Sequence, residues 1–151
     1  MSLSNIFQIS SQGMTAQRER LETASANLAN ANTTRTAEGG PYRRRDVSFE
    51  SAPLIDPYLS FSSELSFLSD DQPASQGVRA TTLIAEQDNG AKRYQPGHPD
   101  SDANGYVTMP DVDPLEETVN ILSAARSFEA NATAFNTAKE MARASLKLSE
   151  A

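Results

Sequence analysis

Residues 4–32 read SNIFQISSQGMTAQRERLETASANLANAN, and this stretch decides the fold. Apolar and small residues recur along it at alternating steps of four and three, at Leu3, Phe7, Ser10, Met14, Gln17, Leu21, Ala24, Leu28 and Ala31. Such spacing is a heptad seam, which predicts a helix that packs against another helix. At about 1.5 Å per residue, the helix would be roughly 40 Å long. Gly13 weakens its first turns by about 1 kcal/mol relative to alanine.

A second long helix is predicted over residues 113–151. Asp113 suits the N-cap, Pro114 the first helical position, and Glu116 completes a capping-box pattern three residues after the cap. A second stripe then follows at helical spacing, at Ile121, Ala125, Phe128, Ala132, Phe135, Ala138, Ala142 and Leu146. Basic residues near the end of this segment suit the negative end of the helix dipole.

Both stripes contain many alanines, and single exposed helices of this kind are marginal in water. Each helix therefore needs a partner helix. The periodicity fits two arrangements equally well, a pair of helices within one chain or a bundle formed between chains. The two seams at the ends, separated by a polar middle, indicate that the ends and the middle have different functions.

Short strands are predicted between the helices at residues 42–49, 78–86 and 106–109. The last of these follows Asn104-Gly105 and resembles the second arm of a hairpin. Residues 51–77 are rich in serine, aspartate and proline yet contain several large apolar residues, which predicts an irregular segment that packs on something. The sequence thus predicts an α+β fold with a small β-containing middle.

Composition excludes several classes of protein. The chain of 151 residues has a net charge of -7, and residues 46–77 contain Asp46, Glu50, Asp56, Glu64, Asp70 and Asp71 but no lysine or arginine. Nucleic acid is not an expected partner, because its binding requires many basic contacts to phosphate. Cysteine is absent, which excludes disulfides and thiolate chemistry. Neither a cleaved secretory signal nor a transmembrane helix is expected from the apolar pattern.

Catalytic chemistry has little support. The one histidine, His98, lies between Gly97 and Pro99, and neither a phosphate-binding loop nor a dinucleotide-binding glycine motif occurs. We predict no catalytic residue, no enzyme activity and no cofactor.

One loop has the spacing of a calcium site. Asp100, Asp102, Asn104, Gly105 and Asp111 match positions 1, 3, 5, 6 and 12 of an EF-hand loop. Aspartate at position 12 has a shorter arm than the usual glutamate, and nearby prolines deny the loop its flanking helices. An Asn-Gly turn explains the same residues without metal. A calcium-binding module is thus the alternative function, with Asp100, Asp102, Asn104 and Asp111 as the candidate ligands.

The sequence SANLANAN at residues 25–32 resembles the N-terminal signature of flagellar axial proteins, the family of rod, hook and hook-associated subunits. Three further stretches resemble the proximal rod proteins of that family. They are PYRRRDVSFE at 41–50, QPGHPDSDANGYVTMPDV at 95–112 and SAARSFEANATAFNTAKEM at 123–141. Residues 51–77 are longer and more acidic than this resemblance implies, so no contacts are carried over to them.

The resemblance implies a structural subunit of the basal-body rod, assembled into a torque-transmitting helical tube. It also implies export by the flagellar type III apparatus to the periplasm-spanning rod. The expected partners are copies of the chain, other rod proteins, and membrane-ring and export components. We predict an N-terminal axial helix (1–33), a β-containing middle domain (34–112) and a C-terminal axial helix (113–151). Assembly and helix packing are assigned to Phe7, Met14, Leu21, Asn27, Leu28, Asn30, Ile121, Phe128, Asn131 and Phe135, the asparagines setting the register.

Overall fold

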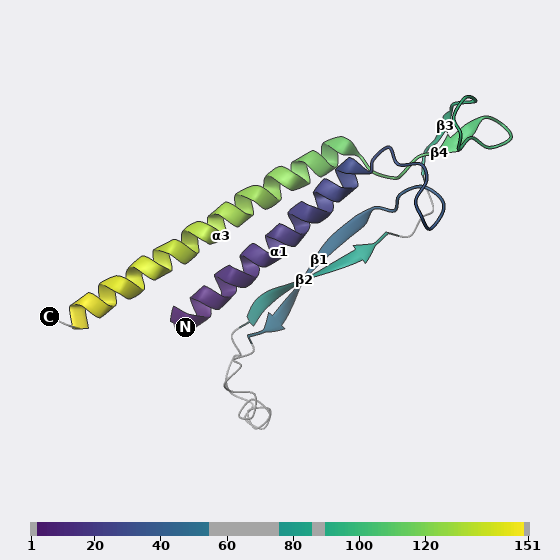
Figure 1. Ribbon diagram of the computed structural model, residues 1–151. Coiled ribbons are helices and arrows are strands. Elements are labelled where there is room, and N and C mark those ends of the chain that lie inside the picture. Colours follow the sequence, from purple (N-terminus) through teal and green to yellow (C-terminus); the bar gives the residue numbers. More distant parts are fainter. Residues whose placement is uncertain (1–2, 55–75, 86–89, 150–151) are drawn as a thin grey trace, which may run out of the picture.

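The computed structural model describes residues 3–54, 76–85 and 90–149 (Figure 1). Its elements follow the order α1 (Leu3–Ala29), β1 (Arg45–Pro53), β2 (Gln76–Ile84), β3 (Lys92–Tyr94), β4 (Tyr106–Thr108) and α3 (Pro114–Ser149). The α+β class predicted from the sequence is confirmed. Two long helices lie side by side, and strands β1 and β2 lie along the face of α1 that α3 leaves open (Figure 1).

The helices α1 and α3 are antiparallel, so the helix pair predicted from the seams forms within one chain. The rings of Phe7 and Phe135 meet near the free ends, with centroids 5.1 Å apart. At the other end, the Arg20 guanidinium donates a hydrogen bond of 3.0 Å to the Asn120 side-chain oxygen. The core between the elements is made of small side chains. In the described part of the chain the buried apolar residues are Ala16, Ala24, Ala31, Val107, Ala124 and Ala138.

Gly13 has a packing role that offsets its cost in helix propensity. A β-carbon at this position would lie 2.9 Å from the side-chain nitrogen of Asn131, which is closer than such atoms approach in proteins. The missing side chain therefore lets α3 come close to α1 at this level.

The β1–β2 pair is attached to α1 by side chains of that helix. The amide of Val78 donates to Gln12 Oε1 at 3.1 Å, and Thr82 donates to Glu19 Oε1 at 2.8 Å. A β-carbon at Gly77 would overlap the Gln12 side chain, so this strand approaches the helix at a glycine. The antiparallel register runs from Arg45 opposite Ile84 to Pro53 opposite Gln76.

The smaller sheet lies beyond the end of the helices (Figure 1). Strand β4 is the arm expected after Asn104-Gly105, and its antiparallel partner is β3, a strand of three residues that the sequence pattern did not indicate. The rings of Tyr94 and Tyr106 pack edge to face across it at 5.3 Å. Gly105 has a φ of 80°, which favours glycine. The expected irregular segment at 51–77 lies mostly outside the described residues, and the three-domain division stays a prediction.

The start of α3 has the N-cap that the sequence predicts but lacks the predicted capping-box contact. Asp113 Oδ1 accepts a hydrogen bond of 2.8 Å from the Leu115 amide, as expected of an N-cap. Glu116, expected to bond back to the cap, instead accepts a hydrogen bond of 2.9 Å from Arg44. Among the helices described, none is long and apolar enough to span a membrane.

Candidate functional site

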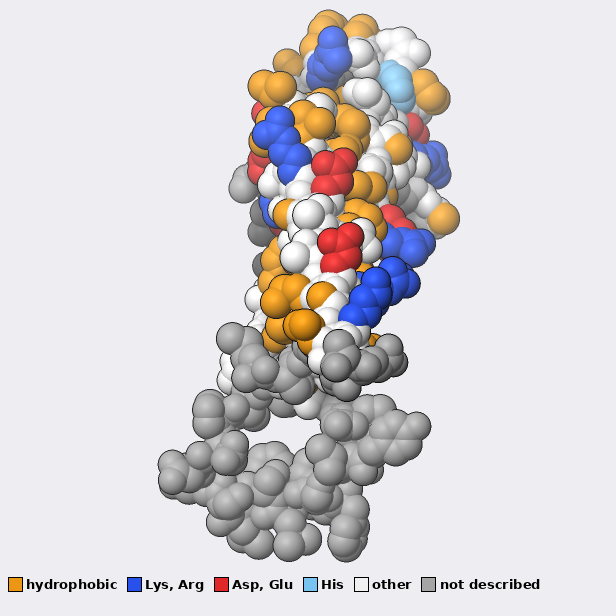
Figure 2. Space-filling model, turned by 90° about the vertical axis from the view of Figure 1, so that its left-hand side faces the viewer, with side chains coloured by type: hydrophobic (Ala, Val, Ile, Leu, Met, Phe, Trp, Pro, Cys, Tyr) orange, Lys and Arg blue, Asp and Glu red, His pale blue; other side chains and the backbone are white. Residues whose placement is uncertain are grey.

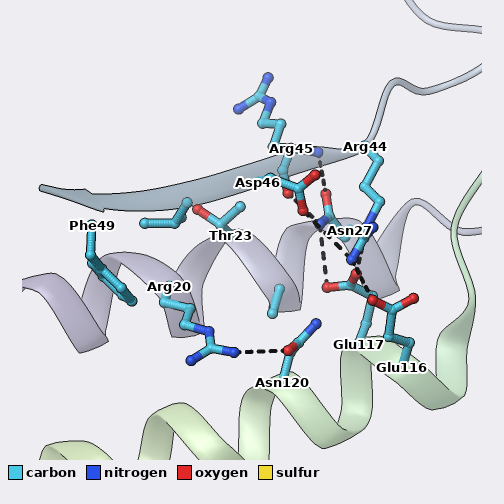
Figure 3. Close-up of a pocket in the computed structure, with 12 residues that line it drawn as sticks. Arg20, Thr23, Asn27, Arg44, Arg45, Asp46, Phe49, Glu116, Glu117 and Asn120 are labelled. Carbon is cyan, nitrogen blue, oxygen red and sulfur yellow. Dashed lines mark hydrogen bonds and ion pairs between the residues drawn. The ribbon is translucent and has the colours of Figure 1, made fainter. Parts of the chain in front are cut away.

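The end of α1, the start of β1 and the start of α3 meet around a pocket of about 340 Å³ (Figure 3). Side chains from three distant parts of the sequence point toward one another here. We call the hydrogen-bonded group at this place the junction network. It consists of Asn27, Tyr42, Arg44, the backbone of Arg45, Glu116 and Glu117.

Asn27 is the centre of the junction network and is 1% exposed. Its side-chain nitrogen donates to the carbonyl oxygen of Arg45 at 2.7 Å and to Glu117 Oε2 at 3.3 Å. Its side-chain oxygen accepts from the amide of Arg45 and the hydroxyl of Tyr42, each at 3.0 Å. Every polar atom of this amide is therefore engaged, as a buried polar group requires.

Glu117 carries a buried charge that the network balances. It is 1% exposed, and Arg44 Nε donates to its Oε1 at 2.9 Å. The same guanidinium reaches Glu116 at 2.9 Å and Asp46 at 3.5 Å through Nη2. The place of Glu117 in the first turns of α3 also favours a negative charge, because the N-terminal end of a helix dipole is positive.

The junction network shifts the pKa values of two of its members, Tyr42 and Arg44. Burial raises the pKa of the Tyr42 hydroxyl, with Arg45 opposing the shift and Glu117 adding to it. Burial alone would lower the pKa of Arg44. The hydrogen bond to Glu117 and the charges of Asp46, Glu117 and Glu116 outweigh that effect and raise it. The network therefore favours neutral tyrosine and charged arginine.

The three asparagines predicted to set register lie in different surroundings. Asn27 ties α1 to β1 and α3 within the subunit. Asn30 donates to the carbonyl oxygen of Ala26 at 2.8 Å and accepts from the Thr33 hydroxyl, which ends its own helix. Asn131 lies at the close approach of α3 to Gly13. Their assignment to contacts between subunits stays a prediction.

The large apolar residues predicted for assembly line one side of the helix pair. We call them the seam flank, namely Phe7, Met14, Leu21 and Leu28 of α1 with Ile121, Phe128 and Phe135 of α3. Six of them are partly exposed and Phe128 is 38% exposed. On α1 they recur at intervals of seven and lie on a different face from Gln12 and Glu19, which hold the strands. The fold brings Phe7 and Phe135 into contact, and all seven residues keep part of their surface exposed.

The candidate calcium loop is occupied by its own hydrogen bonds. Asp102 Oδ1 accepts from the amides of Asn104 and Tyr106, each at 2.9 Å, which is an Asx turn. Asp100 accepts from Thr34 at 2.8 Å and lies 3.5 Å from the Arg35 guanidinium. Within the ranges the structure describes, no three acidic or histidine side chains are placed to hold a metal ion. The alternative calcium function, with Asp111 as a further ligand, therefore gains no support.

Comparison with known proteins matches both helices. The family described as "Flagella basal body rod protein" matches residues 7–35, and the family "Flagellar basal body rod FlgEFG protein C-terminal" matches residues 103–148. The flagellar basal-body rod protein FlgC of Borreliella burgdorferi is 39% identical, with 98% of each chain covered. That of Bacillus subtilis is 39% identical over 98% of this chain and 99% of its own. That of Salmonella typhimurium is 38% identical over 99% and 100%.

The chain belongs to the FlgC family. It is accordingly a structural subunit of the bacterial flagellar basal-body rod. The family models match most of α1 and nearly all of α3, and the relatives align over almost the whole chain. The family resemblance noted in the sequence is therefore confirmed.

Three members of the junction network escaped the sequence analysis of this FlgC-family chain, namely Tyr42, Arg44 and Glu117. One signal was present. Glu117 lies seven residues before Ala124, which lies seven before Asn131, so a charged residue continues the buried face of α3. The partner of that charge could not be inferred, because Arg44 is far away in the sequence.

Proposed function

We propose that this subunit assembles through its seam flank into a helical axial tube that transmits torque along the rod. The neighbours in this proposal are copies of the chain and other rod proteins. Its role is mechanical and involves no catalysis. In a tube of this kind each copy presents two different faces to its neighbours, so the contacts repeat without closing on themselves.

Exposed apolar side chains on α3 carry this proposal. Phe128 of the seam flank is 38% exposed, and Val119 and Leu122 of the same helix are 58% and 55% exposed. Contiguous exposed apolar surface is typical of a site that contacts another protein. A core of alanines with one valine supplies little hydrophobic stabilisation, since the effect scales with apolar area removed from water. Burial against neighbours supplies the stabilisation that the isolated subunit lacks.

Phe128→Asp tests the proposal most directly. Because Phe128 is 38% exposed, the substitution should alter the fold little while placing a charge in the proposed contact. We expect loss of swimming and of assembled rods, with the variant still exported. Leu28→Asp should act likewise, at a larger cost in stability because Leu28 is more buried.

Ala103→Asp serves as the control, because this exposed residue lies in the loop before β4, away from both helices. Its melting temperature and motility should match those of the unmodified chain. Normal swimming with Phe128→Asp would refute the proposed contact. Images of basal bodies that lack the chain should show no rod, and an intact rod would refute the function itself.

We further propose that the subunit leaves the cytoplasm by the flagellar type III apparatus and lies in the periplasm-spanning part of the rod. There it would contact export-apparatus and membrane-ring components at the base. Membership of the FlgC family supports this placement. In cells with an inactive export apparatus, the chain should remain in the cytoplasm; its normal appearance outside would contradict this route.

A further inference from the structure

The Asp100 to Asp111 loop contains an asparagine followed by a glycine in an exposed turn. Asn104 is exposed, and among the described residues its side-chain amide has no hydrogen-bond partner. The turn lies at the end of the molecule opposite the free helix ends (Figure 1), which face the viewer in Figure 2. The Asn104 amide is thus open to water, and the next residue along the chain, Gly105, has no side chain that would shield it.

This pair of residues has an intrinsic reaction. The backbone nitrogen of Gly105 can attack Asn104 Cγ, because glycine has no side chain to obstruct the approach. A carbon–nitrogen bond forms, the Gly105 nitrogen gives its proton to water, and the side-chain nitrogen takes up a proton and leaves as ammonia. Water then opens the five-membered succinimide at either carbonyl and returns a proton to the Gly105 nitrogen. The product is aspartate or isoaspartate at position 104, and the net reaction consumes water and releases ammonia.

The folded turn holds the attacking nitrogen in another interaction. The Gly105 N–H donates to the carbonyl oxygen of Asp102 at 2.9 Å, which closes a β-turn with Asn104 as its third residue. The carbonyl oxygen of Gly105 is also engaged, because it accepts from the Gln95 amide at 2.8 Å. Attack requires the Gly105 nitrogen to lose its proton and to approach Asn104 Cγ. The turn must therefore open before the reaction can begin.

The Asp102 side chain stabilises the closed turn. Its Oδ1 accepts from the amides of Asn104 and Tyr106, each at 2.9 Å, so it binds the residues on both sides of Gly105. The Asp102 amide in turn donates to the carbonyl oxygen of Tyr106 at 2.8 Å. Opening the turn breaks several of these bonds together, and the closed form is favoured accordingly.

We propose that Asn104 is a latent deamidation site, and that the turn centred on Asp102 keeps it unreacted while the subunit is folded. The products do not suit this turn. Isoaspartate adds a backbone carbon before Gly105 and shifts Tyr106 relative to Asp102, whereas aspartate adds a negative charge beside the Asp102 carboxylate. Either product would weaken the pairing of β4 with β3. This inference concerns the smaller sheet and does not depend on the proposed assembly.

Peptide mapping by mass spectrometry measures the reaction at each asparagine. The purified subunit is incubated at mildly alkaline pH, once folded and once in guanidinium chloride. The sequence has a second Asn-Gly pair, Asn89-Gly90, and in the denatured chain both pairs should react at similar rates. In the folded subunit, Asn104 should react at least about tenfold more slowly than in the denatured chain, because the turn must open first. Equal rates at Asn104 in the two states would overturn the proposal.

Two variants separate the hydrogen bonds of Asp102 from its charge. Asp102→Ala should raise the rate at Asn104 in the folded subunit by about tenfold, because two hydrogen bonds that hold the turn are lost. Asp102→Asn keeps a side-chain oxygen that can accept the same bonds without the charge, so its rate should stay close to that of the unmodified chain. An Asp102→Ala variant that reacts no faster than the unmodified chain would overturn the role of the carboxylate.

Asp111→Ala is the matched control. It removes the same charge from an exposed aspartate that follows β4 and has no hydrogen-bond partner within the described part of the chain. Its rate at Asn104 should equal that of the unmodified chain. Asp102→Asn reacting as fast as Asp102→Ala, or Asp111→Ala reacting as fast as either, would show that charge rather than the closed turn protects Asn104, and would overturn the inference.

Discussion

Replacing Asn27 by alanine is expected to destabilise the subunit by about 3–5 kcal/mol. The substitution removes four hydrogen bonds at a residue that is 1% exposed. Each contributes about 0.5–1.5 kcal/mol net, and the partners left behind are partly or fully buried, which places the cost toward the upper end. For a chain of 151 residues, such a loss lowers the melting temperature by roughly 10 °C.

Thermal unfolding of the purified subunit, followed by circular dichroism, measures this effect. Asn32→Ala is the matched control, because Asn32 belongs to the same SANLANAN stretch and is exposed. It should melt within about 2 °C of the unmodified chain, as surface substitutions do. Asn30→Ala, which removes bonds at the end of α1, should fall between the two. If Asn27→Ala melted together with Asn32→Ala, the junction network would not hold the fold, and the reasoning would be refuted.

The remaining predictions concern neighbouring contacts. Arg44→Met should cost about 3–5 kcal/mol because Glu117 then keeps a buried charge without its cation. Arg35→Met removes an exposed arginine that lies 3.5 Å from Asp100, and it should cost under about 1 kcal/mol in the same unfolding assay. Gly13→Ala should lower stability by about 1–3 kcal/mol because the new methyl group meets Asn131, and Asn131→Ala should restore it; a more stable single variant would show that helix propensity outweighs the contact. Because the pKa of Tyr42 is raised in the folded state, its stability contribution is present below about pH 10 and is lost at higher pH. Tyr42→Phe should therefore flatten the alkaline decline of the melting temperature, and an unchanged slope would contradict this.

The helices could be predicted because their signals are local. Asp113 and Pro114 mark the start of α3 within adjacent residues, and the seam of α1 repeats over its whole length. Strand β3 has no comparable signal, because a strand of three residues is too short for alternation to appear. Its place is set by pairing with β4, which is a tertiary contact.

The junction network could not be predicted, because its members are brought together by the folded chain. Asn27 and Glu117 are far apart in the sequence, and Arg44 lies between them, just before β1. The sequence did indicate that the asparagines of SANLANAN are specificity residues. Sequence alone could not distinguish a bond between subunits from the bond within the chain that Asn27 makes.

The Asp100 to Asp111 loop shows a different limit. Aspartate and asparagine at alternate positions supply ligands for calcium, and they equally well accept hydrogen bonds from backbone amides in a turn. The same residue types serve both purposes, so only geometry separates them. In the folded chain Asp102 binds the amides of its own turn, which accounts for the pattern without a metal ion.

The two ends of the helix pair differ in how they are stabilised. At one end, Asn27 and Glu117 form buried hydrogen bonds that join three elements. At the other, Phe7 and Phe135 make an edge-to-face contact between α1 and α3. Buried polar bonds fix one geometry and are costly to leave unmade, whereas exposed apolar surface gains free energy wherever a matching surface covers it. The fold therefore fixes the arrangement of helices and strands within each subunit, while the seam flank supplies the exposed apolar surface that we propose neighbouring subunits bury.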